Sequence, residues 1–561
     1  MKLALAALVL AACTEDVQLD TRLAGLVSVT VAPADTTLSI DGLDAQPQTV
    51  AFSATGTFSD GTTRDITSLV TWSVDNAAPG AVAAGGTYTT SDAAGGHVHV
   101  LATTSGATAS AALTIVVSAS LVDATFPPPG SPTTLFPPGV QPITGDAMRA
   151  PTVLYPSDGT MFPQGVVSTL VQYAPGMAND AFRIGFDSDV LHLAVYSGAP
   201  RWAADGALWS LVGESGIDDP IALAIEATDS TVPGTIYASA PIALDFSRDA
   251  PAGTISYWSS SANGVMRGAL GAASAGKLYP STPTCVGCHA ISRDGTAMAM
   301  GFANENAPML QTVALDSLAT VIDAGQHAQG GWATYSPDGS LVLVAHDGML
   351  TLRDARTGAG VGSPNGAVML PPMTFATHPD WSPDGSAVAV AISKMAPTDK
   401  DVSGASIAIL PVQAGAFGPP RVLVAATGMD TDYFPRWSPD GKYLAFVHAT
   451  TSSHAASSAE LRVVAATGGT PTVLATASGS GQFDTMPVWA PVQGELSWLA
   501  FATVRPYGAV MPMPNQAQIW IAALDLSRAA DPSYAAFWLP CQDITTLDNN
   551  PVWSIPTGGP E

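Results

Sequence analysis

The sequence predicts an all-β protein, in which two β-sandwiches are followed by a large domain of repeated sheets. Of the 561 residues only 12% are charged, whereas 53 are glycine and 45 are proline. This composition favours short strands joined by tight turns over long helices. Apolar and polar residues alternate in short runs, and a motif built on Ser-Pro-Asp-Gly recurs in the second half. A chain of this length is expected to hold about three or four domains.

The net charge is −26, from 46 acidic and 20 basic residues. An acidic surface repels the phosphates of nucleic acids and of anionic lipids. We therefore expect no nucleic-acid partner, and solubility is the simplest role for the excess charge.

The N-terminal residues predict export. Lys2 precedes a short apolar run, and Leu10-Ala-Ala-Cys13 ends that run with small residues before a cysteine. The pattern resembles the lipobox of bacterial lipoproteins. The resemblance implies that residues 1–12 are a signal peptide, and that Cys13 is lipidated and anchors the chain to a membrane.

Residues 13–24 are expected to form a tether after this anchor. Thr14 follows the cysteine where an aspartate would imply the inner membrane, so the resemblance implies an outer-membrane lipoprotein that faces the periplasm or the cell surface. An ordinary secretory peptide is the alternative. The apolar run is too short to cross a bilayer.

Residues 25–118 are predicted to form the first sandwich. Val27, Val29 and Val31 alternate onto one face of a strand. The run Phe58-Ser-Asp-Gly-Thr-Thr-Arg-Asp-Ile-Thr67, followed by Val70-Thr-Trp-Ser-Val74, resembles bacterial Ig-like group 2 domains, which implies a spacer or adhesive module. His97 and His99 lie on one strand, and without a third ligand we expect a polar strand face rather than a metal site.

A proline-rich linker is predicted for residues 119–150, because runs such as Phe126-Pro-Pro-Pro-Gly130 favour polyproline II geometry. Alternating runs, among them Phe182–Phe186, predict a second sandwich over residues 151–250, Ig-like or fibronectin-like. Trp202 and Trp209 are expected in its core.

Residues 253–556 repeat one motif, which decides the fold of this part. The four strong copies are Ile291-Ser-Arg-Asp-Gly295, Tyr335-Ser-Pro-Asp-Gly339, Trp381-Ser-Pro-Asp-Gly385 and Trp437-Ser-Pro-Asp-Gly441, and Trp489-Ala-Pro491 and Trp553-Ser554 are weaker copies. In each, an aromatic or apolar residue ends a strand, the next residues make a hairpin turn and an apolar strand returns. Sheets of this kind cannot bury both faces alone, but a ring of them can.

These repeats resemble those of TolB-like β-propellers. Six motif copies predict six blades, with five or seven as the alternatives. The last copy has almost no chain after it, so Thr254–Trp258 and Val265–Leu270 are expected to share a blade with the C-terminal strand and to close the ring. The acyl-hydrolase pattern G-x-S-x-G is absent from the sequence, as is H-E-x-x-H, so a hydrolase is not indicated.

The segment Cys285-Val-Gly-Cys288-His289 has the C-x-x-C-H spacing that attaches a c-type haem. Two thiols on one short turn can each add to a vinyl group of the macrocycle, and the imidazole after the second can bind the iron. The alternatives are a bare disulfide and half of a zinc site, and no second Cys/His pair at close spacing supports zinc. The prediction is one covalent haem c, held by Cys285 and Cys288, with His289 as proximal iron ligand.

The alignment of the repeats places the haem motif in the loop before the first inner strand, at the mouth of the central channel. The second axial ligand is expected from an equivalent loop. His378 is the favoured candidate, Met486 and His327 are alternatives, and an iron with no protein ligand on that side is a further one. The combination of C-x-x-C-H with Ser-x-Asp-Gly resembles a group of exported bacterial propellers with one embedded c-haem.

Other residues of the repeat region are given structural roles. Met298 and Met300 are expected in the core of a blade, and Cys541 is expected to be a buried thiol outside the haem motif. Asp432 and Asp484 lie in the ring of loops, where acids are usually solvated.

The first functional hypothesis is an exported, lipid-anchored monohaem cytochrome that passes electrons to a redox partner protein in the periplasm or at the cell surface. The second is an envelope scaffold for protein interactions, in which the haem is structural or a sensor. The third is a haem oxidase or peroxidase of a small substrate, which needs an open site at the iron. An electron carrier or binding protein is favoured over a hydrolase.

Overall fold

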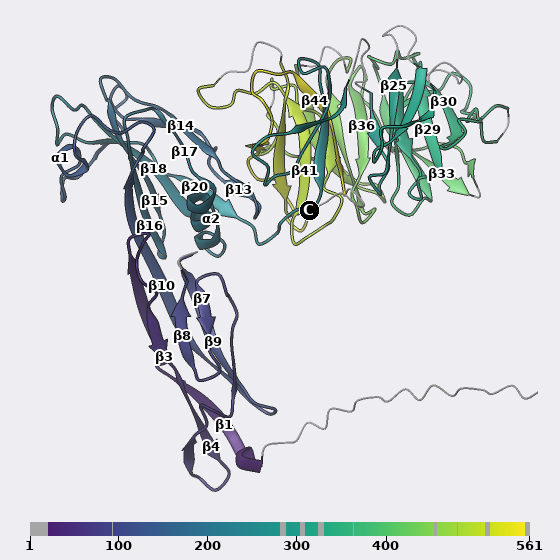
Figure 1. The fold of residues 1–561 in the computed structure, drawn as a ribbon. Coiled ribbons are helices and arrows are strands. Elements are labelled where there is room, and N and C mark those ends of the chain that lie inside the picture. The colour runs from purple at the N-terminus through teal and green to yellow at the C-terminus, as the bar shows by residue number, and fades with distance from the viewer. Residues whose placement is uncertain are drawn as a thin grey trace, which may run out of the picture. The chain divides into compact units, whose positions relative to one another are not determined.

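The computed structural model describes residues 21–91, 94–280, 288–302, 309–323, 330–362, 364–413, 415–453, 457–479, 481–510 and 516–555 (Figure 1). Strands dominate these residues. Their helices are the 3-10 turn η1 (Thr21–Leu23), α1 (Pro132–Leu135) and α2 (Gly206–Ser215). This confirms the all-β prediction. Among the described residues, no helix has both the length and the apolar character that a membrane span requires.

The chain divides into two compact units, Met1–Ala119 and Ser120–Glu561. The first unit is a β-sandwich whose core contains fully buried Phe52 and Tyr88. Its strands are β1 (Leu26–Ala32), β2 (Asp35–Asp41), β3 (Thr49–Ala51), β4 (Ser53–Phe58), β5 (Thr63–Asp65), β6 (Thr71–Val74), β7 (Gly80–Val82), β8 (Thr87–Thr90), β9 (Gly96–Thr103) and β10 (Thr108–Val122). They form the sheets β1-β4-β5, β3-β8-β7 and β2-β10-β9-β6. His99 is exposed on β9 and bonds Asp75 at 2.7 Å, in keeping with a polar strand face.

The second sandwich lies in the second unit. Its strands are β11 (Ile143–Thr144), β12 (Thr152–Tyr155), β13 (Thr160–Phe162), β14 (Leu170–Ala174), β15 (Ala181–Asp187), β16 (Leu191–Ser197), β17 (Arg201–Ala203), β18 (Ile221–Thr228), β19 (Tyr237–Ala238) and β20 (Ile242–Phe246). One sheet contains β12-β14-β17, and the other contains β11-β19-β18-β15-β16 with β20 and β13. Trp202 and Trp209 are buried, as predicted. Helix α2 was not predicted from the sequence.

The predicted proline-rich linker, residues 119–150, takes part in the second sandwich, although no sheet pairing was expected of it. Ile143–Thr144 pairs with β19 as part of a sheet. Leu135 and Phe136 are buried against Ala181 and Ile236. The prolines keep this segment from forming a long strand, but its apolar residues still pack onto the sandwich, because burying them removes apolar surface from water.

Six further sheets form the propeller, which confirms the six-bladed prediction (Figure 1). Each blade is numbered by its motif copy. Blade 1 is β24 (Ala290–Ile291), β25 (Ala297–Phe302), β26 (Met309–Ala314) and β27 (Thr320–Ile322); blade 2 is β28 (Trp332–Tyr335), β29 (Leu341–His346) and β30 (Met349–Asp354); blade 3 is β31 (Phe375–Trp381), β32 (Ala387–Ser393), β33 (Ser406–Gln413), β34 (Ala416–Phe417) and β35 (Arg421–Val424). Blade 4 is β36 (Thr431–Trp437), β37 (Tyr443–Ala449), β38 (Glu460–Ala465) and β39 (Thr472–Val473); blade 5 is β40 (Thr485–Trp489), β41 (Ser497–Thr503), β42 (Gln518–Leu524) and β43 (Phe537–Trp538); blade 6 is β44 (Asp548–Ser554), β21 (Thr254–Ser259), β22 (Gly264–Gly268) and β23 (Gly276–Pro280).

Blade 6 joins the two ends of the repeat region. The C-terminal strand β44 pairs antiparallel with β21, from Thr254↔Ser554 to Ser259↔Asp548. This is the closure expected from the sequence. The inner strands contact one another in the cyclic order β24, β28, β31, β36, β40, β44 and back to β24.

Each strong motif copy forms the same hairpin turn. In blade 4, Ser438 Oγ accepts the Tyr443 N–H at 3.0 Å and donates to Asp440 Oδ1 at 2.6 Å. Gly441 has φ +71°, a conformation that glycine adopts without steric cost. The turn therefore needs a hydroxyl, a carboxylate and a glycine at fixed spacing, which explains the repeat.

The blades are apolar inside. Met298 and Met300 are fully buried with Val313, which confirms their predicted role as blade core. Cys541 is 3% exposed, as predicted, and burial raises the pKa of its thiol to about 12. A thiol with such a pKa is protonated and unreactive at neutral pH.

The second sandwich packs against blade 5. The rings of Phe162 and Phe537 lie 5.1 Å apart, and Tyr155 Oη accepts the Trp538 N–H at 3.1 Å. Gln172 Oε1 also accepts the N–H groups of Ala509 and Val510. These contacts hold one side of the propeller and leave its central channel to the inner strands.

Candidate functional site

The candidate site is the central channel, where equivalent positions of the six inner strands face one another. The positions are counted from the motif serine or its equivalent: Ser292, Ser336, Ser382, Ser438, Ala490 and Ser554. Two layers matter. The fourth residue before each of these makes a layer that we call the closure layer, composed of Cys288, Trp332, His378, Phe434, Met486 and Asn550.

In four of the blades, an irregularity of the inner strand positions the side chain of this layer. His378, Phe434, Met486 and Asn550 all have φ near +50°, a left-handed conformation that is uncommon for residues other than glycine. The pairing register of their strands shifts beside these residues. Bulges of this type re-aim side chains. Four consecutive blades therefore share one local distortion at the same level of the channel.

One half of the closure layer is aromatic. The rings of His378 and Phe434 have centroids 3.8 Å apart, and Trp332 lies 4.8 Å from Phe434 and 5.1 Å from His378. Trp332 belongs to blade 2 and Phe434 to blade 4, so their contact passes the inner strand of blade 3 on the channel side. All three side chains are buried.

Hydrogen bonds link the other half. The Asn550 backbone N–H donates to Sδ of Met486 at 3.2 Å. Asn550 Nδ2 lies 3.2 Å from Nδ1 of His289 and donates to the His289 carbonyl oxygen at 3.1 Å. These contacts connect blades 5, 6 and 1.

A cavity of about 300 Å³ lies beyond the closure layer and is lined by residues from all six blades. It extends from the level of His289 to the hairpin turns, where Pro439, Pro491 and Ile555 line it. No residue of the closure layer is among its lining residues. Because Arg293 and Ile555 at the turn end are exposed, the cavity opens to solvent there.

The second layer consists of the residues two positions before each motif serine or its equivalent. These residues line the cavity and give it two chemically different sides. Its members are Ala290, Thr334, Asp380, Arg436, Val488 and Val552. Asp380 and Arg436 come from neighbouring blades, and the positions in blades 5, 6 and 1 are apolar. The cavity therefore has a charged side and an apolar side.

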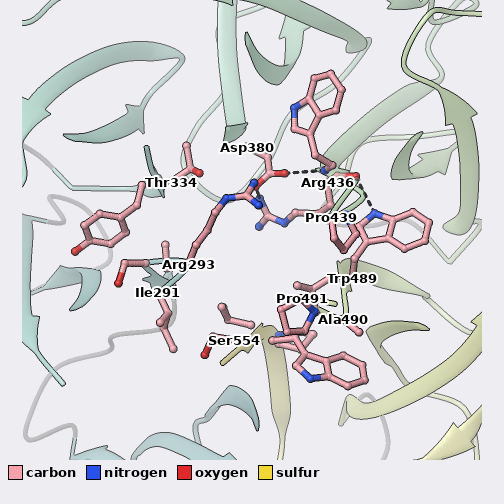
Figure 2. A pocket seen from close by; sticks show the side chains of 18 of the residues that line it. Ile291, Arg293, Thr334, Asp380, Arg436, Pro439, Trp489, Ala490, Pro491 and Ser554 are labelled. Atoms are coloured by element: carbon pink, nitrogen blue, oxygen red, sulfur yellow. Dashed lines mark hydrogen bonds and ion pairs between the residues drawn. The ribbon is translucent and has the colours of Figure 1, made fainter. Parts of the chain in front are cut away.

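Two guanidinium groups meet on the charged side. Figure 2 shows the side chains of Arg293 and Arg436 converging beside Asp380. Arg293 Nη2 donates to the Trp381 carbonyl at 2.8 Å, which takes the side chain from blade 1 to blade 3. Arg436 Nη1 lies 3.7 Å from Asp380 Oδ1.

Asp380 is the carboxylate of this group. Its Oδ2 accepts the Trp437 N–H at 2.7 Å. Burial raises the pKa of Asp380, and the positive charges of Arg436 and Arg293 oppose that rise. Two guanidinium groups and at most one carboxylate leave the charged side with excess positive charge in either protonation state of Asp380.

His378 is a neutral imidazole. Burial lowers its pKa well below the ordinary value, and the charge of Arg436 adds to this effect. Its Nδ1 atom is buried and makes no hydrogen bond with the described residues. A neutral imidazole can bind a metal, but the ring already packs against Trp332 and Phe434.

The predicted haem-binding residues are only partly within the described structure. Cys285 lies outside the described residues, as do Cys13 and His327. Cys288 is partly exposed, and His289, which immediately precedes β24, is 4% exposed. A thiol next to an imidazole fits the donor types that a c-type haem needs.

The contact with Asn550 bears on which ring nitrogen of His289 carries the proton. Asn550 Nδ2 can only donate, so Nδ1 accepts and the proton of a neutral ring is on Nε2. An iron-bound histidine offers its Nε2 lone pair and usually donates from Nδ1. An Asn550 amide with Oδ1 toward the ring would favour that tautomer, but it would lose the hydrogen bond that Nδ2 donates to the His289 carbonyl.

The described distal candidates lie in different halves of the closure layer. Met486 connects to His289 through Asn550, whereas His378 lies in the aromatic half. The structure thus brings Met486 into the hydrogen-bonded group that contains His289.

The acids in the loop ring are buried, which differs from the expected solvated state. Asp432 bonds His448 Nδ1 at 2.8 Å, and Asp484 bonds Arg505 Nη2 at 2.9 Å. Asp548 occupies the same repeat position with no basic partner among the described residues, and burial raises its pKa to about 6. The repeat position is therefore structural in blades 4 and 5.

One further group has metal-ligand residue types. His346 and Asp347 are consecutive, and Asp399 lies beside them. His346 Nδ1 bonds Asp399 Oδ2 at 2.6 Å, and its Nε2 lies 3.5 Å from Asp347 Oδ2. Both ring nitrogens are thus engaged, and the group serves as a link between blades 2 and 3.

Sequence reasoning missed the two arginines of the cavity. Arg293 had a visible signal, because it replaces the proline that stands at 337, 383, 439 and 491. Proline favours the first corner of such a turn, so an arginine there gives up local turn preference. Arg436 had no comparable signal, since the residue at its position varies from blade to blade.

No protein-family model matches the chain. No curated protein matches it either. Solved structures similar to it include TolB from Acinetobacter baumannii, at 15% identity over 60% of this chain and 79% of that chain, with a TM-score of 0.38. A putative TolB from Agrobacterium tumefaciens is 17% identical over 54% of this chain and 97% of that chain, with a TM-score of 0.31. The dihydro-heme d1 dehydrogenase NirN is 19% identical, over 52% of this chain and 54% of that chain, with a TM-score of 0.33. This chain is similar to these proteins in fold alone.

Proposed function

We propose that this chain is a binding protein of the bacterial cell envelope, whose propeller receives part of a partner protein in its central cavity. The observation that carries the proposal is the cavity itself: about 300 Å³, lined by all six blades and open at the turn end. Pockets of roughly this size with apolar walls and a few placed polar groups commonly bind ligands.

The test is crosslinking in cells of the source organism. A photoreactive residue in place of Pro491, at the cavity opening, should give a discrete crosslinked product, to be identified by mass spectrometry. The same residue in place of Met369, which is 79% exposed and away from the cavity, is the matched control. Ile555→Trp adds bulk at the opening and should weaken the product at Pro491. Equal products at both positions would contradict the proposal.

Envelope location belongs to the same proposal, with lipidation at Cys13 as its basis in the sequence. Cys13→Ser should abolish metabolic labelling with a fatty-acid analogue and release the protein from the membrane fraction. Labelling that survives this change would show that the lipobox assignment is wrong.

A second candidate function is electron transfer through a covalent haem c to a redox partner protein. The observation that favours it is the Cys285-Val-Gly-Cys288-His289 motif, whose histidine lies at the inner end of the cavity. When bound, such a group would supply one-electron redox chemistry. Cys285 and Cys288 would hold it, and His289 would offer Nε2 to the iron.

Mass spectrometry of protein from the source organism tests this candidate. The peptide that contains residues 285–289 should carry the added mass of one haem, and Cys285→Ala should remove it. Cys541→Ala is the matched control and should retain the haem. An unmodified peptide from wild-type protein would rule out electron transfer by this route.

Spectroscopy would then assign the second axial ligand. A change from low-spin to high-spin bands in Met486→Leu, but not in His378→Phe, would assign Met486. The reverse result would assign His378. High-spin iron in the wild-type protein would instead indicate the haem oxidase or peroxidase hypothesis.

A further inference from the structure

The charged side of the cavity carries an inference about the chemistry of the ligand, and it rests on the binding function proposed above. Three charged side chains line the cavity: Arg293, Asp380 and Arg436. They come from blades 1, 3 and 4, so the ring must be closed to bring them together. The excess is at least one positive charge, in a chain whose net charge is −26.

Arg293 and Arg436 have more N–H donors than their contacts within the protein use. A guanidinium group has five N–H donors in a planar fork. Arg293 uses one of them on the Trp381 carbonyl. Arg436 Nη1 is held only by long contacts, at 3.4 Å to the Pro379 carbonyl and 3.7 Å to Asp380 Oδ1. Asp380 Oδ2 accepts the Trp437 N–H, and Oδ1 lies 3.7 Å from Arg436 Nη1, which is too far for a hydrogen bond.

The arrangement of the lining residues favours an organic anion that has an apolar part. Arg436 is 17% exposed and approaches from the wall, whereas Arg293 reaches in from the open end. The side of the cavity formed by blades 5 and 6 carries Val488, Trp489 and Val552. Figure 2 shows Trp489, Ala490 and Pro491 lying apart from the two guanidinium groups. A ligand with one charged end and one apolar part would satisfy both sides.

We propose that Arg293 and Arg436 bind the carboxylate of an organic ligand whose apolar part rests on the Val488, Trp489 and Val552 side. A carboxylate matches the guanidinium fork, because two parallel N–H···O bonds can form. The cavity opens at the turn end, where a chain end can enter, so the carboxyl-terminal residue of a partner polypeptide is one source of this group. A free apolar carboxylic acid is the other source.

Isothermal titration calorimetry on the purified full-length chain tests the proposal with three probes. The tripeptide Ala-Ala-Leu with a free carboxyl terminus should bind, and the same peptide with an amidated terminus should bind at least about tenfold more weakly, because the charge-assisted bonds are lost. 4-Methylpentanoate represents the free acids. If it binds as tightly as the peptide does, the carboxylate site stands but the partner-protein function fails.

Variants separate recognition from structure. Arg293→Gln changes an exposed side chain and should weaken binding of Ala-Ala-Leu at least about tenfold without unfolding the protein. Arg436→Gln should have the same effect. Arg421→Gln, on β35 outside the cavity, is the matched control and should bind like the wild type.

Asp380→Asn gives the most discriminating result. Removal of the competing carboxylate should strengthen binding of the free-acid peptide several-fold, since the arginines then face no other negative group in the cavity. A purely structural ion pair would give no such gain. Equal binding of the free and amidated peptides, or no binding of any carboxylate to the wild type, would overturn the inference. A crosslinked partner at Pro491 together with no carboxylate binding would leave the binding function intact and reject only this chemistry.

Discussion

Asn550 Nδ2 lies within hydrogen-bond distance of two atoms of His289, at 3.2 Å from Nδ1 and 3.1 Å from the carbonyl oxygen. The two residues are 261 positions apart, and their contact joins the C-terminal strand to the start of blade 1. We expect Asn550→Ala to lower the free energy of unfolding by about 2 kcal/mol, since buried acceptors lose their donor. Urea unfolding measures this. Asn549→Ala, which changes the neighbouring residue instead, should stay within about 0.5 kcal/mol.

The repeat position held by Asp484 and Asp548 predicts opposite effects of one substitution. Burial raises the pKa of Asp548 to about 6, so the folded state binds its proton more tightly than the unfolded state does. The stability that this group contributes is present below about pH 4 and is lost as the pH rises through about 6. Asp548→Asn should therefore stabilise the protein by up to about 3 kcal/mol at pH 8 and by little at pH 4.

Asp484→Asn should do the reverse. It removes one partner of a buried pair with Arg505 and leaves the guanidinium uncompensated, at an expected cost of about 3–5 kcal/mol. Thermal unfolding of both variants at pH 4 and pH 8 provides the comparison. A destabilising Asp548→Asn at pH 8 would show that its carboxylate has a cationic partner.

His378 predicts a dependence on acid. Burial depresses its folded-state pKa, so its contribution to stability is present above about pH 6.5 and is lost as the pH falls. Between pH 7.5 and 5.0 the wild type should lose about 2 kcal/mol more than His378→Phe, because phenylalanine does not titrate. Phe434 adopts φ +50° at the same repeat position, so the backbone accepts this residue type. Urea unfolding at the two pH values measures the difference.

The turn serines predict a further difference between blades. Ser382 Oγ donates to Asp384 at 2.7 Å and accepts the Ala387 N–H at 3.0 Å. Ser382→Ala should cost about 1–2 kcal/mol of unfolding free energy because both bonds are buried or half-buried. Ala490→Ser should gain less than about 0.5 kcal/mol, since Val492 stands where the other turns have aspartate. Calorimetric scans of both variants decide this, and a comparable gain from Ala490→Ser would refute the role given to the aspartate.

The repeat made the propeller predictable. Because Ser438, Asp440 and Gly441 each meet a local demand of one turn, their recurrence counts the blades without any long-range information. The pairing of β44 with β21 followed from the same count, as an incomplete last copy needs strands from elsewhere. The cores of the sandwiches were equally visible in alternating residues such as Phe182 and Ile184.

The channel was less predictable, because its contents depend on which side chains cross the ring. The bond from Arg293 to the Trp381 carbonyl joins blades 1 and 3, and no local pattern specifies it. The packing of Trp332 on Phe434 likewise depends on bulges that the sequence does not mark. Leu135 and Phe136 were assigned to a linker because nearby prolines dominate the local pattern, whereas burial is decided by the sandwich beside them.

The pairing of β44 with β21 also has a consequence for biosynthesis. Ribosomes release a polypeptide from its N-terminus, so β21 emerges about 290 residues before the strand that completes its sheet. Until residues 548–554 follow, the inner edge of β21 is unpaired and the ring of blades is open at this point. The exposed strand edge can then pair with another chain. Premature termination even a few codons before residue 548 would thus yield an aggregation-prone product, and quality-control proteases could distinguish finished from unfinished molecules by this single seam.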